Sequence, residues 1–170
     1  VSLHQVEYKK VDLETLGKPE GYVARQVTNW GKQYRKAQTE EVPEAFQVMQ
    51  WMEEHQPKTY DYCLIHNDYK YDNVVFKDDS WQEITAVLDW EMATLGDPLM
   101  DLGTSLGYWT VATDHEMVKK GIPSPTLFEG NPKRSEIVEQ YAKKTGKAID
   151  DFVFYYVFGL FKIAVIAQQI

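Results

Sequence analysis

Two apolar segments, each followed by acidic side chains, constrain this sequence more than any other feature. The first, residues 62–65, precedes Asp68 and Asn73, and the second, residues 84–88, leads directly to Asp89. The first segment has the length and composition of a short buried strand and the second has those of a short strand, and such strands can hold the polar loops that follow them in fixed positions. The sequence therefore predicts that Asp68, Asn73 and Asp89 converge in one site.

These three side chains have the chemistry that phosphoryl transfer requires. The reaction needs a positioned hydroxyl nucleophile and neutralisation of the charge on the phosphates, usually through Mg²⁺. Asp68 is the expected base, which accepts or orients the proton of the hydroxyl group. Asn73 and Asp89 are the expected metal ligands, because hard Mg²⁺ prefers oxygen donors. We therefore expect Mg²⁺ as the cofactor and ATP as the co-substrate.

The loop that carries Asp68 resembles the catalytic loop of protein kinases, His-Arg-Asp-Leu-x-x-x-Asn. His66, Asp68 and Asn73 match this pattern, but Asn67 occupies the position of the Arg. In protein kinases this Arg commonly receives the phosphate of the activation loop. Its replacement therefore indicates an enzyme that is not switched in this way and that does not act on proteins.

Two further segments extend the resemblance, Asp89-Trp90-Glu91 and residues 96–102. With the catalytic loop, they make the chain similar to the aminoglycoside phosphotransferase and choline kinase family, most specifically over residues 63–107. Residues 88–98 and 17–22 look most like the phosphotransferase domain that some proteins carry fused to an acyl-CoA dehydrogenase.

The resemblance implies a fold of the α+β class that is mainly α. Residues 1–170 would form the carboxy-terminal lobe of the protein-kinase-like fold, with a few short strands around the catalytic loop. Residues 1–60 contain nothing that reads as the amino-terminal lobe that clamps the nucleotide, and no Gly-x-Gly-x-x-Gly loop occurs. We therefore expect this chain to lack that lobe and to transfer phosphate poorly by itself.

The family pattern also assigns roles to side chains around the three central residues. Lys70 is expected to be catalytic, near the transferring phosphate, where a cation neutralises charge. A solvated surface lysine explains the same position equally well. His66, Asp97 and Asp101 are expected to support the catalytic loop, although Asp97 could instead cap a helix.

Helical periodicity accounts for most of the remaining chain. The segments expected to be helical are 20–37, 43–56, 98–111, 135–145 and 153–170, with a further strand at 74–76. Residues 112–133 are rich in Gly and Pro and are expected to form a long surface excursion. The last helix is almost entirely apolar but contains Lys162, so we expect a buried helix rather than a membrane span.

Composition argues against one class of partner and bears on the cellular setting. A net charge of -8 argues against nucleic acid, because binding requires a basic surface that displaces counterions from phosphates. The single cysteine, Cys63, excludes a disulfide within the chain and favours a reduced, cytoplasmic setting. The sequence does not predict the oligomeric state.

The predicted function is ATP-dependent phosphorylation of a hydroxyl group on a small molecule. The resemblance suggests an aminoglycoside-like, choline-like or hydroxyacyl thioester acceptor. Two alternatives stay open: a catalytically silent binding or scaffold lobe, and a metal-dependent phosphohydrolase that uses the same carboxylates on water. The presence of Asp68, Asn73 and Asp89 together favours the kinase.

Overall fold

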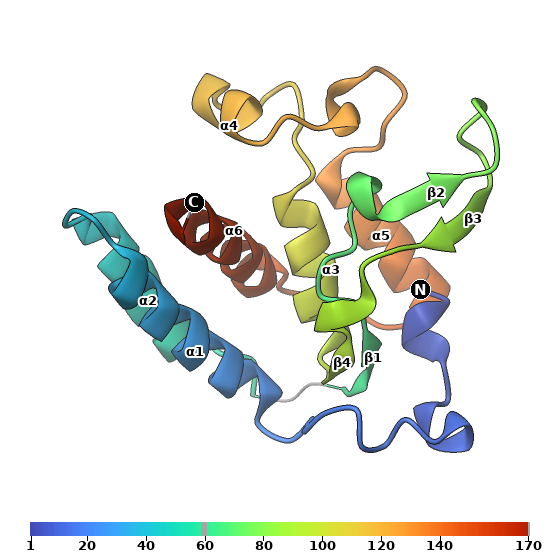
Figure 1. The fold of residues 1–170 in the computed structure, drawn as a ribbon, viewed down its shortest axis with the longest axis horizontal. Helices are drawn as coiled ribbons and strands as arrows, with labels where there is room; N and C mark the ends of the chain where they lie inside the picture. Colours follow the sequence, from blue (N-terminus) through green and yellow to red (C-terminus); the bar gives the residue numbers. More distant parts are fainter. Residues whose placement is uncertain (59–60, 170) are drawn as a thin grey trace.

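Helices dominate the computed structural model, which describes residues 1–58 and 61–169 (Figure 1). The six α-helices of this part of the chain are α1 Tyr22–Ala37, α2 Pro43–Glu54, α3 Pro98–Gly107, α4 Glu116–Gly121, α5 Arg134–Thr145 and α6 Val153–Gln169. The strands are β1 Cys63–Ile65, β2 Val74–Phe76, β3 Ile84–Val87 and β4 Thr94–Gly96. A mainly helical chain with a few short strands was the predicted fold class.

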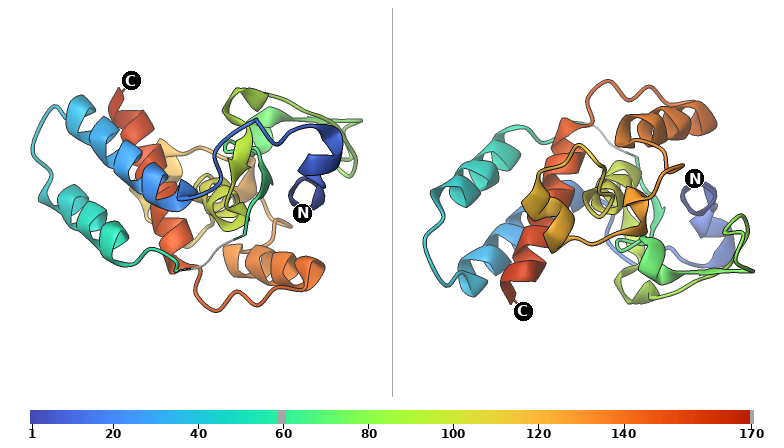
Figure 2. Two further views of the ribbon diagram at one scale, coloured as in Figure 1. Left: turned by 90° about the horizontal axis from the view of Figure 1, so that it is seen from below. Right: turned by 90° about the horizontal axis from the view of Figure 1, so that it is seen from above.

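Three helices, α1, α2 and α6, lie side by side on one side of the molecule, as Figures 1 and 2 show. α1 is amphipathic and buries Val23, Val27 and Trp30 at helical spacing. These side chains meet Phe158 and Phe161 of α6 in the main hydrophobic core. Each large apolar side chain that is fully buried contributes about 1.5–3 kcal/mol, so this core is the main source of stability.

α3 and α6 contact each other through their backbones at two glycines. A Cβ atom on Gly103 would lie 2.2 Å from the carbonyl oxygen of Tyr155, and one on Gly159 would lie 2.2 Å from the carbonyl oxygen of Gly103. No side chain fits at these distances. The spacing between the two helices is therefore set by direct backbone contact.

Two small antiparallel sheets flank the loops that carry Asp68 and Asp89. β1 pairs with β4, with Leu64 opposite Leu95, and β2 pairs with β3, with Val75 opposite Ala86. The loop after β1 carries Asp68, and the chain reaches Asp89 shortly after β3. The short strand β4 was not predicted, because three residues are too few to show a periodic pattern.

Several predicted boundaries are wrong. The helix expected over 98–111 ends at Gly107, because the chain then turns so that Thr110 is buried against Thr126 at 3.3 Å between the hydroxyl oxygens. The surface excursion at 112–133 contains the short helix α4 and a 3-10 turn, Pro125–Leu127. The predicted end of the last helix, residue 170, lies outside the described residues.

Every helix in the described ranges falls short of the length and apolar character that a membrane crossing needs. α6 covers 17 residues and includes Lys162, whose side chain is buried. Its all-round apolar character reflects burial between α1, α2 and α3.

Candidate active site

The loop between β1 and β2 places Asp68 against Asn73. The side-chain nitrogen of Asn73 donates to the carboxylate of Asp68 at 2.9 Å and to its backbone carbonyl at 2.7 Å. Because the amide nitrogen faces Asp68, the amide oxygen of Asn73 is directed away and can accept another ligand. Asn73 is buried, whereas Asp68 is partly exposed. The pair thus combines a fixed amide with an accessible carboxylate.

Lys70 is bound to the same carboxylate. Its ammonium lies 2.9 Å from Oδ2 of Asp68 and 4.7 Å from the centre of the Tyr108 ring. Tyr108 is half-buried, and burial together with the nearby Asp68 carboxylate raises the pKa of Tyr108 to about 12. Lys70 is therefore held beside the predicted base and is not an ordinary solvated lysine, although its catalytic role stays a prediction.

His66 ties the catalytic loop to the chain segment that ends in Asp89. Its Nδ1 accepts a hydrogen bond from the amide of Asp68 at 3.3 Å, so its Nε2–H can donate to the carbonyl of Leu88 at 2.9 Å. The amide of Leu88 donates in turn to the carbonyl of Asn73 at 2.8 Å. These two bonds place the backbone just before Asp89 next to the segment that carries Asp68 and Asn73. The convergence of the three side chains stays a prediction.

Asp89 is exposed, and its backbone is left-handed, with a φ of 61°. Few residues adopt this conformation without strain, but Asp and Asn do so more readily than most. Strained backbone of this kind clusters at functional sites. The left-handed residue turns the chain sharply out of β3 and into the 3-10 turn Trp90–Met92.

Asn67, which replaces the kinase Arg, is bonded to four parts of the structure. Its side chain accepts from the Tyr22 hydroxyl of α1 at 2.9 Å and donates to the carbonyl of Met92 at 3.0 Å. Its amide donates to Asp101 at 2.6 Å, and its carbonyl accepts from Lys162 at 2.6 Å. Its φ of 68° is again left-handed. Asn67 therefore fixes the path of the loop just before Asp68.

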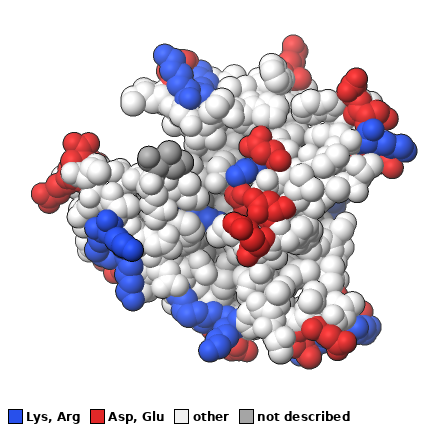
Figure 3. All heavy atoms as spheres, viewed as in Figure 1, with Lys and Arg blue, Asp and Glu red and all other residues white. Residues whose placement is uncertain are grey.

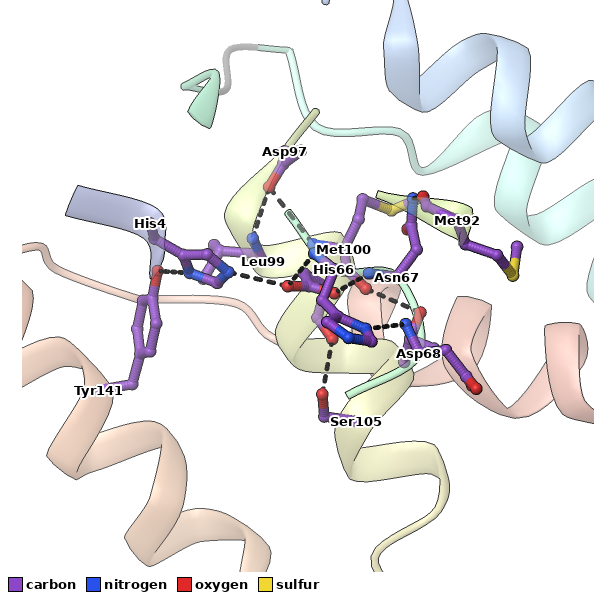
Figure 4. Close-up of polar contacts among 12 residues, drawn as sticks. His4, His66, Asn67, Asp68, Met92, Asp97, Leu99, Met100, Ser105 and Tyr141 are labelled. Atoms are coloured by element: carbon purple, nitrogen blue, oxygen red, sulfur yellow. Dashed lines mark hydrogen bonds and ion pairs between the residues drawn. The ribbon is translucent and has the colours of Figure 1, made fainter. Parts of the chain in front are cut away.

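Figure 4 shows His4, His66 and Asn67, which all bond to the carboxylate of Asp101 in α3. This carboxylate accepts from the amides of His66 at 3.1 Å and Asn67 at 2.6 Å, and from His4 at 2.9 Å. His4 is held in turn by the hydroxyl of Tyr141 at 2.8 Å. Burial alone would raise the pKa of Asp101, but the hydrogen bonds from His4 and the two amides outweigh it and leave this pKa below the ordinary value.

Asp97 caps α3 instead of contacting the loop directly. Its carboxylate accepts from the amides of Leu99 at 2.7 Å and Met100 at 3.4 Å, and the Tyr155 hydroxyl lies 3.5 Å away. It is buried, not exposed, and burial raises the pKa of Asp97 to about 6. Its predicted support of the catalytic loop is therefore indirect, through the helix that carries Asp101.

By their chemistry, the side-chain oxygens of Asn73 and Asp89 fit the preference of a magnesium ion for oxygen donors. Within residues 1–58 and 61–169, no group of three or more His, Cys, Asp or Glu side chains could hold a metal ion. Mg²⁺ is typically bound through one or two protein carboxylates plus substrate phosphates. Asn73 and Asp89 offer such an incomplete set. Figure 3 shows carboxylates near the centre of the face that also carries these loops.

Sequence reasoning missed four polar side chains that support this loop: His4, Tyr108, Tyr141 and Lys162. Each acts across a large separation in sequence, for example 97 residues between His4 and Asp101. Of these four, Lys162 alone could have been found from the sequence, because a lysine in an otherwise apolar helix needs a polar partner.

Comparisons with known proteins identify a matching family and several relatives of this chain. The model of the phosphotransferase enzyme family (APH) matches residues 1–122. Acyl-CoA dehydrogenase family member 10 of Mus musculus is 34% identical over 178 residues, which cover 99% of this chain and 16% of that protein. Acyl-CoA dehydrogenase family member 11 of Homo sapiens is 34% identical over 172 residues, which cover 99% of this chain and 22% of that protein.

Two solved structures share the fold. A putative aminoglycoside phosphotransferase from Ralstonia eutropha gives a TM-score of 0.81 with 32% identity, covering 98% of this chain and 51% of that one. An aminoglycoside-3'-phosphotransferase of type VIII gives a TM-score of 0.63 with 19% identity, covering 94% of this chain and 56% of that one, and supports the fold alone. The chain thus spans about half the length of the solved structures and about a fifth of the curated relatives.

Proposed function

The chain belongs to the phosphotransferase enzyme family, and from this premise we propose that it carries the base and metal ligands of an ATP- and Mg²⁺-dependent kinase. The acceptor would be a hydroxyl group on a small molecule. The observation that carries the proposal is the placement of the Asp68 carboxylate. The side-chain nitrogens of Asn73 and Lys70 each lie 2.9 Å from its Oδ2. The loop that carries these residues lies beside the segment that ends in Asp89.

In the proposed reaction, the hydroxyl oxygen attacks the γ-phosphorus of ATP while the bond to the β–γ bridging oxygen breaks and ADP leaves. Asp68 accepts the hydroxyl proton, or orients the hydroxyl for attack. Lys70 keeps the Asp68 carboxylate in position and places a positive charge near the transferring phosphate. Asn73 and Asp89 would hold Mg²⁺, which neutralises charge on the phosphates when it is bound.

We also infer that residues 1–170 act as the carboxy-terminal lobe of a longer, two-lobed enzyme. This is supported by the chain's coverage of only about half of each solved relative. The isolated chain would then transfer phosphate far more slowly than the full-length protein. Equal turnover numbers for the 170-residue chain and the full-length protein would contradict this inference.

The relatives help to rank the predicted acceptors. Those named as acyl-CoA dehydrogenase family members favour a hydroxyacyl thioester. The solved structure named as a putative aminoglycoside phosphotransferase keeps an aminoglycoside-like or choline-like acceptor as the competing proposal. The buried, unpaired Cys63 supports a cytoplasmic setting for the reaction.

Nucleotide binding by the full-length protein tests the proposed function. We expect Mg²⁺-dependent binding of ATP that Asp89→Ala abolishes, while Asp72→Ala, which removes a neighbouring exposed carboxylate, leaves it intact. Asp68→Asn should keep the binding but remove phosphoryl transfer. Binding that is indifferent to Asp89→Ala would favour a silent scaffold, and phosphate release without any acceptor alcohol would favour a phosphohydrolase.

A further inference from the structure

A pocket of about 280 Å³ lies between α1, the catalytic loop and α6. Tyr22 and Trp30 of α1 form one wall, Phe158 and Lys162 of α6 form another, and Asn67 of the catalytic loop also lines it. Asn67 directly precedes Asp68 in the chain. A small molecule in this pocket would therefore lie next to the loop that carries the proposed base.

The charge of this pocket is opposite to that of the whole protein. Lys18, Arg25 and Lys162 line it, and none of the described residues that line it is Asp or Glu. The full chain has a net charge of -8. A partly enclosed site lined by one sign of charge attracts ligands of the opposite sign. The pocket is therefore suited to an anion and unsuited to a polycation.

Lys162 is the cation with the most unusual surroundings. It is 2% exposed, it lies in an otherwise apolar helix, and burial lowers its pKa to about 8. An ammonium group has three donors. Among the described residues, one hydrogen bond is recorded for it, to the carbonyl of Asn67 at 2.6 Å, and the Trp30 ring centre lies 5.5 Å away. The remaining donor capacity of this buried charge is available to an oxygen ligand in the pocket.

Arg25 has a different position in the same wall. Its guanidinium donates to the backbone carbonyls of Lys18 and Glu20, which fixes the chain segment before α1. Arg25 thus adds positive charge to the pocket while its main contacts are structural. Lys18 is exposed. Among the three cations, Lys162 is the one that is both buried and in contact with the catalytic loop.

We propose that this pocket binds an oxyanion group of the acceptor substrate and that Lys162 is the residue that recognises it. The inference rests on the proposed function, because it assumes that the acceptor lies beside Asp68. It narrows the acceptor to an alcohol that also carries a carboxylate or a phosphate. Since Lys162 also holds the carbonyl of Asn67, the bound oxyanion and the catalytic loop share one anchoring side chain.

Ligand-observed NMR titration of the full-length protein tests the proposed oxyanion binding and does not depend on turnover. The probes are glycerate, glycerol 3-phosphate, neutral glyceramide and cationic choline. We expect at least one of the two oxyanion probes to bind at least tenfold more tightly than glyceramide, and choline to bind weakest. Glycerate against glycerol 3-phosphate then distinguishes a carboxylate from a phosphate. Equal affinities for all four probes, or a preference for choline, would overturn the proposal.

Three variants test whether Lys162 causes the preference for oxyanion probes. Lys162→Met, similar in length but neutral, should remove the preference for oxyanions, Lys162→Arg should keep most of it, and the control Lys18→Met should change affinity less than threefold. An unchanged preference in Lys162→Met would refute the role of this residue. If Lys162→Met does not fold, loss of the preference in Lys18→Met would refute the assignment in the same way.

The outcomes separate this inference from the proposed function. Oxyanion binding needs no nucleotide, so it can succeed in a protein whose Mg²⁺-dependent ATP binding ignores Asp89→Ala. In that case the kinase proposal fails and the anion site stands. Conversely, a protein that transfers phosphate but binds glyceramide as tightly as both oxyanion probes keeps the kinase proposal and loses the anion site.

Discussion

Replacing Asp101 by asparagine should strongly destabilise the catalytic loop. In the folded chain the carboxylate is 3% exposed, with Oδ1 bonded to the amide of Asn67 and Oδ2 bonded to the amide of His66 and to His4. Asparagine has a single acceptor oxygen, so its NH₂ group must face at least one of these donors. The variant therefore loses a hydrogen bond to a charged group and leaves a buried amide unpaired.

The cost follows from these contacts. A hydrogen bond to a charged group contributes about 1.5–3 kcal/mol, and a buried donor without a partner costs about 1–3 kcal/mol. We therefore expect Asp101→Asn to lower the free energy of unfolding by roughly 3–5 kcal/mol, the range found when one partner of a buried ionic contact is removed. A loss of this size is a large part of the stability of a typical domain.

Urea unfolding of the 170-residue chain, followed by circular dichroism, measures this difference. The matched control is Asp150→Asn, which changes an exposed carboxylate and should shift stability by less than about 0.5 kcal/mol. Because the pKa of Asp101 is lowered on folding, its stabilisation is fully present above the ordinary value of 3.8 and is lost as the pH falls through the folded value. A loss below about 1 kcal/mol at pH 7 would refute the reasoning.

Three further predictions address stability and reactivity. Gly103→Ala and Gly159→Ala should each lower the free energy of unfolding by about 3 kcal/mol in urea, whereas Gly121→Ala, whose Cβ would meet nothing within 4 Å, should change it by less than about 1 kcal/mol. Equal effects at all three glycines would contradict the backbone contact. Since the pKa of Asp97 is raised to about 6, the stability that its protonation contributes is present below 3.8 and is lost as the pH rises to about 6. Relative to Asp97→Asn, the wild-type chain should therefore lose about 3 kcal/mol between pH 3.5 and 7, and a constant difference would refute this. Burial raises the pKa of the Cys63 thiol to about 12, so iodoacetamide at pH 8 should modify the native chain at least about 100-fold more slowly than the unfolded chain.

The sequence is enough to propose those parts of the candidate site whose determinants are local. Asp68 and Asn73 lie in one loop, and Asp89 directly follows a short apolar segment, so spacing along the chain singles them out. Their roles stay predictions. α1 was predicted within two residues of its start, because its buried side chains recur at helical spacing over 16 residues. The capping of α3 by Asp97 could also be predicted from the sequence, since an Asp-Pro pair is typical of a helix start.

The rest depends on contacts that no local pattern encodes. His4 lies in a segment without clear periodicity, and only the folded chain brings it to Asp101 and Tyr141. β4 exists because β1 offers it a pairing edge. Lys162 was read as evidence against a membrane span, whereas its bond to Asn67 required the packing of α6 to be known.

The contact between Gly103 and Gly159 has a consequence for how enzymes with this architecture can diverge. α3 holds the catalytic loop from below through Asp101, and α6 holds it from the side through Lys162. Because these two helices touch backbone to backbone at Gly103 and Gly159, a larger residue at either position would push the two helices apart. α1 reaches the loop through the Tyr22 hydroxyl. Substitutions along α1 change the pocket wall that Tyr22 and Trp30 form, whereas larger residues at the two glycines would move both anchors of the loop.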